Sequence, residues 1–233
     1  MNYLGLEELI KGALMEDVGH GDITTYNLIP ADKFSKGEFY AKAEGVVAGI
    51  DIAQAVLEYM EAEIKFYPTK KDGDLVNVGE VIARVEGTTR TLLTGERLAL
   101  NFMQRLSGIA SKTRNMVELV KYQKAELIDT RKTTPGLRVL EKYAVNVGGA
   151  RNHRFGLYDG VMIKDNHIAA VGGIQKAIST IRGKIPHTIK IEVEVENLDE
   201  LREALNAHAD IILLDNMDIE MMKEAVAITD GRA

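Results

Sequence analysis

The 233-residue chain contains no cysteine, which excludes a disulfide framework and any metal site built on thiolates. It has no tryptophan, only 6% aromatic residues and a net charge of -6, whereas surfaces that bind nucleic acid are basic and often aromatic. No stretch approaches the roughly 18 consecutive apolar residues that a membrane span requires. We therefore expect a cytoplasmic protein that binds neither membranes nor nucleic acid.

The sequence also lacks two common catalytic patterns. It has no GxxxxGKS or GxxxxGKT loop, which cradles the phosphates of ATP or GTP. No order of Ser, His and Asp, or of Cys and His, indicates an activated nucleophile. ATP hydrolysis and acyl transfer are therefore disfavoured, and electrostatic catalysis on an anionic substrate is the hypothesis that remains.

A basic segment stands out on this acidic chain. Between residues 131 and 164 there are two acidic residues, Glu141 and Asp159, and seven basic ones. The basic residues are Arg131, Lys132, Arg138, Lys142, Arg151, Arg154 and Lys164, with His153 as a further possible charge. Such a local positive cluster on a negative protein favours a small, highly charged anionic ligand over a nucleic-acid surface.

The first hundred residues predict a mixed α/β layer. Helical spacing of apolar residues and alternation of apolar with polar residues indicate the elements. The expected elements are helices over 3–15 and 50–60, strands over 36–47 and 63–66, and short strands within 72–93. The glycine-broken segment 16–25 could offer His20 and its aspartates to a metal, but a connecting turn is the favoured interpretation.

A long amphipathic helix is predicted over residues 95–120, with Thr94 as its cap. Its buried stripe is expected to comprise Leu98, Phe102, Leu106, Ile109, Thr113 and Val117. Arg97 would then lie in the first turn, where a cation is mildly unfavourable against the helix dipole. Arg97 is either a solvated surface residue or one that is kept for a ligand, and both interpretations stay open.

The rest of the chain alternates strictly between strand and helix. The predicted pairs are 125–129 with 137–146, 160–163 with 171–182, 188–195 with 198–207, and 210–214 with 218–228. Strands that alternate with helices form right-handed βαβ units around a parallel sheet or barrel. The fold class is therefore α/β, and we expect domains over residues 1–102 and 103–233.

Polar residues directly follow several of these strands. Arg131 and Lys132 follow the first, Lys164 the second and Asp215 the fourth, while Glu192, Glu194 and Glu196 alternate along the third. Ligands of such folds bind at the carboxyl ends of the strands, so these groups are expected to share one site. Cations next to carboxylates suit a phosphorylated substrate that carries Mg²⁺.

At these residues the sequence resembles the quinolinate phosphoribosyltransferases, which are the carboxylating nicotinate-nucleotide pyrophosphorylases of NAD biosynthesis. The resemblance spans nearly the whole chain. The matching blocks are EDVGHGDITT, GERLALNFMQRLSGIAS, DTRKTTPGLR, EKYAVNVGGARNHRFGL, MIKDNHI, IEVEVE and IILLDN. It implies an N-terminal α/β open-faced sandwich followed by an irregular α/β barrel, in a homodimer whose active sites are completed by the partner chain.

The resemblance also implies residue roles. Arg131, His153 and Arg154 would hold the two carboxylates of quinolinate, and Arg97 would reach them from the partner chain. Lys132 and Lys164 would contact both quinolinate and phosphoribosyl pyrophosphate. Glu194 and Asp215 would face the ribose and the Mg²⁺-pyrophosphate. The expected reaction joins quinolinate to the ribosyl carbon, releases pyrophosphate and CO₂, and gives nicotinate mononucleotide.

One departure from the family pattern concerns the carboxyl-terminal end. Members of the family continue beyond a segment like TDGRA with further strands and loops that bind the 5′-phosphate, whereas this sequence ends at Ala233. The expected barrel is therefore incomplete, and we expect the 233-residue form to bind quinolinate better than it turns it over. Two alternatives are a molybdenum-transport-associated relative of the same family and a non-catalytic binding protein on the same fold.

Overall fold

The structure is a computed structural model that describes residues 5–233, and it divides into two compact units between His153 and Arg154. Each unit is described by itself. The predicted domain boundary after residue 102 stays a prediction. No helix of residues 5–233 combines the length and apolarity needed to cross a bilayer.

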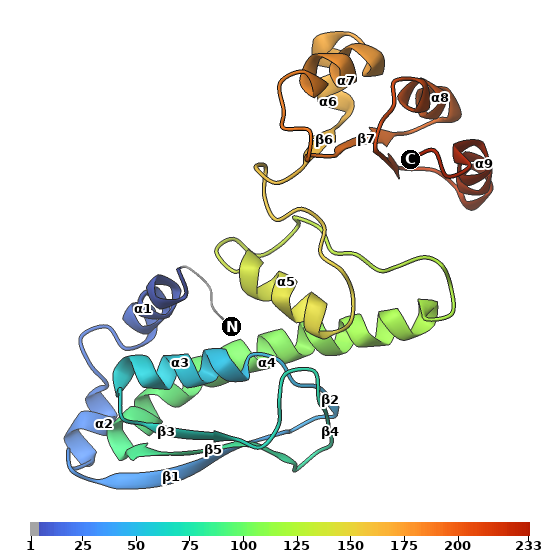
Figure 1. The fold of residues 1–233 in the computed structure, drawn as a ribbon. Coiled ribbons are helices and arrows are strands. Elements are labelled where there is room, and N and C mark those ends of the chain that lie inside the picture. Colours follow the sequence, from blue (N-terminus) through green and yellow to red (C-terminus); the bar gives the residue numbers. More distant parts are fainter. Residues whose placement is uncertain (1–4) are drawn as a thin grey trace. The chain divides into compact units, whose positions relative to one another are not determined.

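The first unit contains two antiparallel sheets and the helices that pack on them (Figure 1). Its elements are α1 (Leu6–Asp17), α2 (Ile23–Leu28), β1 (Phe34–Tyr40), β2 (Gly45–Val46), α3 (Ile50–Met60), β3 (Lys65–Pro68), β4 (Leu75–Val76), β5 (Val81–Thr88), α4 (Thr89–Val120) and α5 (Arg138–Val147). Strand β5 is central in the sheet β1-β5-β3, and β2 pairs with β4. Helices α3 and α4 lie over one face of the larger sheet, as expected for an open-faced sandwich.

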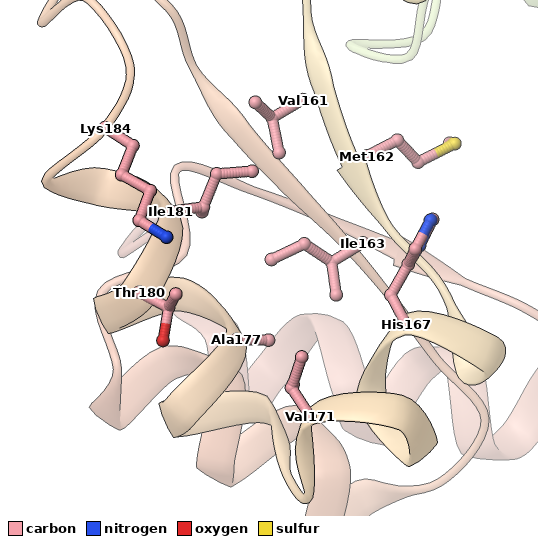
Figure 2. A pocket seen from close by; sticks show the side chains of 9 residues that line it. All are labelled: Val161, Met162, Ile163, His167, Val171, Ala177, Thr180, Ile181 and Lys184. Carbon is pink, nitrogen blue, oxygen red and sulfur yellow. The ribbon is translucent and has the colours of Figure 1, made fainter.

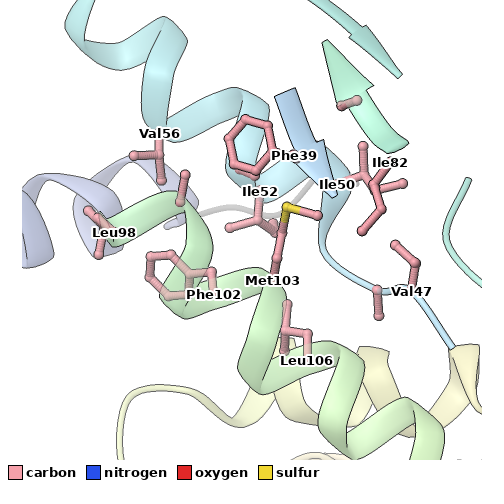
Figure 3. Packing of buried hydrophobic residues seen from close by; sticks show 14 of the residues in the cluster. Phe39, Val47, Ile50, Ile52, Val56, Ile82, Leu98, Phe102, Met103 and Leu106 are labelled. Carbon is pink, nitrogen blue, oxygen red and sulfur yellow. The ribbon is translucent and has the colours of Figure 1, made fainter. Parts of the chain in front are cut away.

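The core of this unit lies between α3, α4 and the strands (Figure 3). Helix α4 presents Leu98, Phe102 and Leu106 to this core, and all three are at least 90% buried. These residues recur every four positions, so the 3.6-residue period places them on one side of the helix. The predicted buried stripe of α4 is confirmed at Leu98, Phe102, Leu106 and Thr113, whereas Ile109 and Val117 are only partly buried.

Two predicted boundaries in this unit are wrong. The predicted strand 36–47 is two strands, because β1 ends after a register shift at Phe39 and Tyr40 and the chain then pairs β2 with β4. The segment 16–25 was expected to be a turn throughout, yet α2 begins at Ile23 because the Asp22 carboxylate accepts a hydrogen bond from the Thr25 amide at 2.9 Å.

Helix α4 begins six residues earlier than predicted, at Thr89. Thr88 is its N-cap, and Glu61 in turn accepts hydrogen bonds from the Thr88 amide and, at 2.7 Å, from the Thr88 hydroxyl. Partial burial raises the pKa of Glu61, but the hydrogen bonds from Thr88 and Thr91 outweigh that effect and lower it overall. Arg97 therefore lies in the third turn of α4, beyond the reach of the helix-dipole effect.

Helix α5 packs directly on α4 through a glycine. A Cβ atom added at Gly148, the residue that ends α5, would lie 2.6 Å from the carbonyl oxygen of Ala110 and 2.6 Å from Cβ of Thr113. Real Cβ atoms do not approach backbone atoms so closely, so only glycine permits this separation. The position of α5 on the long helix is thereby fixed, which matters because α5 supports the loops of the candidate site.

The second unit contains a parallel sheet in the order β6-β7-β8. Its elements are β6 (Val161–Ile163), α6 (Asp165–Val171), α7 (Ile174–Arg182), β7 (Ile191–Val195), α8 (Leu198–Asn206), β8 (Ile211–Leu214) and α9 (Ile219–Thr229). Ile191, Val193 and Val195 are fully buried with residues of the helices, so alternation puts Glu192 and Glu194 on the other face. The predicted βα alternation with parallel strands is confirmed.

Two predictions about the βα alternation are wrong, one in each unit. The predicted helix 171–182 begins at Ile174, and α6 lies before it, because Gly172 and Gly173 adopt φ angles of 88° and 131° and separate the two helices. The predicted strand 125–129 is only a single bridge between Ile128 and Arg151. The ladder stops there because both backbone groups of His153 are bonded to side chains instead.

The Glu61 carboxylate provides a test of this architecture by pH. We expect Glu61→Gln to lower the free energy of unfolding at pH 7 by about 1 kcal/mol, because charged acceptors form the stronger hydrogen bonds. Since the native pKa of Glu61 is lowered, this stabilisation is present above its ordinary value of 4.5 and is lost as the pH falls through the native pKa. Urea unfolding measured from pH 7 to pH 3 checks it, with the exposed Glu63→Gln as the control. If the difference in unfolding free energy between the wild type and Glu61→Gln does not change with pH, the assigned role of the Glu61 charge is wrong.

Candidate active site

The carboxyl ends of three neighbouring strands carry the polar groups of the second unit. Lys164 directly follows β6, Glu194 is near the end of β7, and Asp215 directly follows β8. The Lys164 ammonium contacts the Glu194 carboxylate at 2.7 Å, and the Asp215 amide donates to the carbonyl of Val195 at 3.0 Å. The structure therefore brings these three predicted residues to one edge of the sheet.

These groups differ in their exposure to solvent. The side chain of Glu194 is 12% exposed and that of Lys164 is 44% exposed, while Asp215 is exposed. Glu192 is buried, and Glu196 lies beyond the end of β7, so the three alternating glutamates do not form one equivalent row. The edge thus offers one open carboxylate, that of Asp215, and one ion pair whose partly exposed cation, Lys164, an anionic ligand can reach.

His167 is a residue of this edge that the sequence reasoning did not single out. Its Nδ1 accepts a hydrogen bond from the Lys164 amide at 3.1 Å, which fixes the backbone of Lys164 at the start of α6. The motif IKDNH contains the signal, because a side chain three residues after an N-cap can bond back to it. His167 supports the position of Lys164.

Arg154 opens the second unit and lies on a tight loop. Its Nη1 donates to the carbonyl of Gly160 at 2.9 Å, and the Asp159 carboxylate accepts from the amides of Phe155 at 2.7 Å and Gly156 at 2.9 Å. Partial burial raises the pKa of Asp159, yet the backbone hydrogen bonds lower it overall, as does the positive charge of Arg154. The Asp159 carboxylate thus holds the loop over residues 155–159 in a tight turn.

In the first unit, α5 holds the loop that carries Arg131 and Lys132. The Glu141 carboxylate accepts from the Thr134 amide at 3.1 Å and from Arg105 Nε at 2.9 Å. Burial raises the pKa of Glu141, but the hydrogen bonds from Arg105 and Thr134 lower it overall. Glu141 therefore stays ionised while it joins the loop to both α4 and α5.

The next residue of α5, Lys142, anchors a second segment. Its side chain is fully buried and its ammonium donates to the carboxylate of Asp129 and, at 2.9 Å, to the carbonyl of His153. Asp129 also accepts from the His153 amide at 2.8 Å and from the Asn152 side chain at 2.7 Å. Lys142 and Asp129 thereby bring the segment before Arg131 next to His153.

The structure changes how the basic segment is interpreted. Lys142 is neutralised by Asp129, Arg151 pairs with Glu126 at 3.0 Å, and Arg138 donates to the Thr133 hydroxyl at 3.0 Å. Three of the seven cations of the basic segment therefore have partners in the protein. The other four are the cations predicted to bind a ligand, Arg131, Lys132, Arg154 and Lys164, and of these Lys164 is paired with Glu194 at 2.7 Å.

Two of these arginines carry an unsatisfied buried nitrogen. Among residues 5–233, the buried side-chain nitrogen atoms without a hydrogen-bond partner are Nε of Arg131 and Nε of Arg154. An unpaired buried donor of a guanidinium group is costly, and a carboxylate is the acceptor that matches its planar geometry. Both arginines are thus suited to an anionic ligand.

Arg97 is exposed and lies on α4. It is eight residues before Arg105, the residue of α4 that reaches Glu141, and eight residues of helix span about 12 Å. The structure of one chain does not bring Arg97 to Arg131 or His153 through any hydrogen bond or ion pair described for residues 5–233. Both sequence interpretations of Arg97 therefore stay open at this point.

A hollow of about 320 Å³ in the second unit lies next to β6, α6 and α7 (Figure 2). Its lining is mainly apolar, and none of the eight predicted site residues is part of it. Val161, Ile163 and Ile181 surround its centre, whereas His167 stands at one side. A hollow of this composition does not suit a phosphate or a dicarboxylate.

The carboxylates at the end of the second unit's sheet can be compared with the ligands that Mg²⁺ needs. Residues 5–233 contain no cluster of three or more His, Asp or Glu side chains able to hold a metal by themselves. Mg²⁺ is usually bound through one or two carboxylates together with substrate phosphates. The open carboxylate of Asp215, with Glu194 on the neighbouring strand, fits an ion that arrives with a phosphorylated substrate.

Comparison with known proteins identifies relatives along nearly the whole chain. The family model described as quinolinate phosphoribosyl transferase, C-terminal domain, matches residues 109–233, and the model of the N-terminal domain matches residues 22–107. A probable nicotinate-nucleotide pyrophosphorylase (carboxylating) of Bacillus subtilis is 45% identical over 98% of this chain and 79% of its own length.

Two further relatives show the range of the similarity. A chloroplastic nicotinate-nucleotide pyrophosphorylase (carboxylating) of Arabidopsis thaliana is 41% identical over 97% of this chain and 70% of its own length. The crystal structure of NadC from Streptococcus pyogenes superposes with a TM-score of 0.94 at 44% identity, covering 100% of this chain and 83% of that one.

Proposed function

The chain belongs to the quinolinate phosphoribosyltransferase family, and from this premise we propose how its own residues perform the reaction. The enzyme transfers a phosphoribosyl group from phosphoribosyl pyrophosphate to quinolinate with decarboxylation, a step of NAD biosynthesis. The observation that carries the assignment to residues is the unsatisfied Nε of Arg131 and of Arg154. Two cationic groups with free donors match a substrate with two carboxylates.

Quinolinate is held by the guanidinium groups of Arg131 and Arg154, together with His153. Guanidinium groups bind carboxylates in a bidentate manner and stay charged at every physiological pH. A binding site with several fixed cations favours a dianion over a monoanion such as nicotinate, because desolvated cations left without a partner are costly. This preference accounts for the specificity of the reaction.

Phosphoribosyl pyrophosphate is bound by Lys132, Lys164, Glu194 and Asp215. The location of the last three at the carboxyl ends of neighbouring strands supports this role, since such edges bind ligands in parallel α/β folds. Glu194 and Asp215 would also hold Mg²⁺ that is bound to the pyrophosphate. The ion, when bound, neutralises the charge of the departing pyrophosphate.

The reaction needs charge stabilisation at two points. The ring nitrogen of quinolinate attacks the anomeric carbon, the bond from that carbon to the pyrophosphate oxygen breaks, and positive charge develops on the ribose. Lys132 and Lys164 stabilise the pyrophosphate that leaves, and the carboxylate of Glu194 stabilises the ribose. The carboxylate next to the ring nitrogen then leaves as CO₂, and the electron pair left on the ring carbon takes up a proton.

The active enzyme is a homodimer in which Arg97 of each chain serves the site of the other. The exposure of Arg97, and its distance along α4 from the loop that carries Arg131, support a role in trans. This proposal resolves the open question about Arg97 in favour of a ligand. A cytoplasmic location remains a prediction from the sequence, and the absence of cysteine agrees with it.

The first test measures quinolinate binding. We expect Arg154→Ala to weaken binding by about 30- to 100-fold, because a hydrogen-bonded ion pair is lost from the site. Calorimetric titration of quinolinate checks this, with nicotinate as the monocarboxylate comparison. Arg182→Ala, which removes an exposed arginine paired with Asp210, is the matched control and should bind like the wild type. Equal quinolinate affinity in both variants would refute the assigned role of Arg154.

The second test mixes two inactive variants. Arg97→Ala and Lys164→Ala should each lose most activity, because each homodimer then lacks one part of both sites. After unfolding and refolding a one-to-one mixture, half of the dimers are heterodimers with one intact site, so about a quarter of wild-type activity returns. No recovery, although both variants refold and form mixed dimers, would place Arg97 and Lys164 in the same chain's site or outside the site.

A further inference from the structure

The buried network around Lys142 joins three segments that are distant in the sequence. Lys142 comes from α5, Asp129 precedes the loop that carries Arg131, and Asn152 and His153 follow α5. The Asn152 side chain donates both to Asp129, at 2.7 Å, and to the carbonyl of Lys142, at 2.9 Å. One helix residue and one carboxylate thus attach both segments to α5, in addition to the backbone bridge that joins Ile128 and Arg151.

The network acts on the backbone of His153 from both sides. The amide of His153 donates to Asp129 at 2.8 Å, and its carbonyl accepts from Lys142 at 2.9 Å. These two bonds fix the peptide groups that carry the imidazole. Asp129 lies two residues before Arg131, so the same carboxylate controls both residues.

The burial of this network makes its geometry strict. The side chain of Lys142 is fully buried and that of Asp129 is 8% exposed. Water cannot replace a lost partner at such a site, so the ammonium and the carboxylate must stay together. A surface ion pair could loosen gradually, whereas this one holds a single arrangement.

We infer that Lys142 is a positioning residue for quinolinate: through Asp129 it sets the placement of Arg131 and His153 before the substrate arrives. This inference rests on the proposed function, in which Arg131 and His153 bind the carboxylates. Lys142 itself is buried and does not touch the substrate. Preorganised binding groups raise affinity because less ordering is required when the ligand binds.

A stabilising role and a positioning role of Lys142 have different effects when the residue is replaced. A lysine that served stability alone would, when replaced, change the folded fraction and leave the kinetic constants of the folded enzyme unchanged. A positioning residue changes the KM for quinolinate selectively. The KM for phosphoribosyl pyrophosphate should change less, because Lys164, Glu194 and Asp215 lie outside the network and only Lys132, of the four residues proposed to bind it, is carried by the loop after Asp129.

The test compares steady-state kinetics of four variants with those of the wild type. Lys142→Met removes the ammonium at similar volume, and Asp129→Asn combined with Lys142→Met removes both charges so that neither is left buried alone. Asn152→Ala removes only the amide bonds to Asp129 and Lys142. Tyr143→Phe is the control, because it removes the hydrogen bond of the next α5 residue to Asp72, at 2.7 Å, without touching the network.

We expect the quinolinate KM to rise at least about tenfold in Lys142→Met and in the double variant, and about threefold in Asn152→Ala. The KM for phosphoribosyl pyrophosphate should stay within about threefold, and Tyr143→Phe should keep both constants even if its Tm falls. If Lys142→Met does not fold, the quinolinate KM of the double variant and of Asn152→Ala tests the positioning role.

Unchanged quinolinate KM in the folded variants would overturn the inference, as would an equal rise for both substrates. The wild type serves as the check on the premise. If the wild type shows neither quinolinate binding nor product, the proposed function fails before any variant is considered. If the wild type works and the variants match it, only the positioning role fails.

Discussion

The contact between Lys142 and Asp129 is the interaction on which the placement of Arg131 and His153, the residues proposed to bind quinolinate, depends. A fully buried ammonium is tolerated only with a charged, hydrogen-bonded partner, and removing one member of such a pair typically costs about 3–5 kcal/mol. The pair connects α5 to two loop segments, which also contact each other in the bridge between Ile128 and Arg151. Buried hydrogen bonds and an ion pair therefore hold these segments, whereas β-ladders hold the strands elsewhere in the fold.

The position of this pair depends on the packing of helix α5 in the first unit. Helix α5 is fixed on α4 by the close approach at Gly148, and α4 is fixed on the sheet by its apolar stripe. Glu141, next to Lys142, extends the same support to the loop after Arg131 through Thr134 and Arg105. Packing therefore places the helix, and two adjacent buried charges transmit that position to the loops.

The second unit positions its polar groups by a different principle. Parallel strands bring their carboxyl ends to one edge by topology, so Lys164, Glu194 and Asp215 converge without a dedicated network. Apolar residues on one face of β7 bury against the helices and leave Glu192 and Glu194 on the other. Chemistry at this edge depends on strand register, which a single-residue slip would destroy.

The parts of the fold that could be predicted are those with a strong local period. The stripe on α4 and the βα alternation after residue 160 follow from side-chain spacing, and the strand-end placement of Lys164 and Asp215 follows from the alternation. The start of α4 at Thr89 was missed because its cap depends on Glu61, 27 residues earlier. Burial of Lys142 could not be predicted, since lysine is rarely buried and its partners are 13 and 11 residues away.

The most direct measurement is the stoichiometry of products when the purified chain is incubated with quinolinate, phosphoribosyl pyrophosphate and Mg²⁺. We expect CO₂, pyrophosphate and nicotinate mononucleotide in equal amounts, no product with nicotinate in place of quinolinate, and loss of turnover when a chelator removes Mg²⁺. Pyrophosphate release without CO₂, or equal use of nicotinate and quinolinate, would contradict a cationic site that selects and decarboxylates the dicarboxylate.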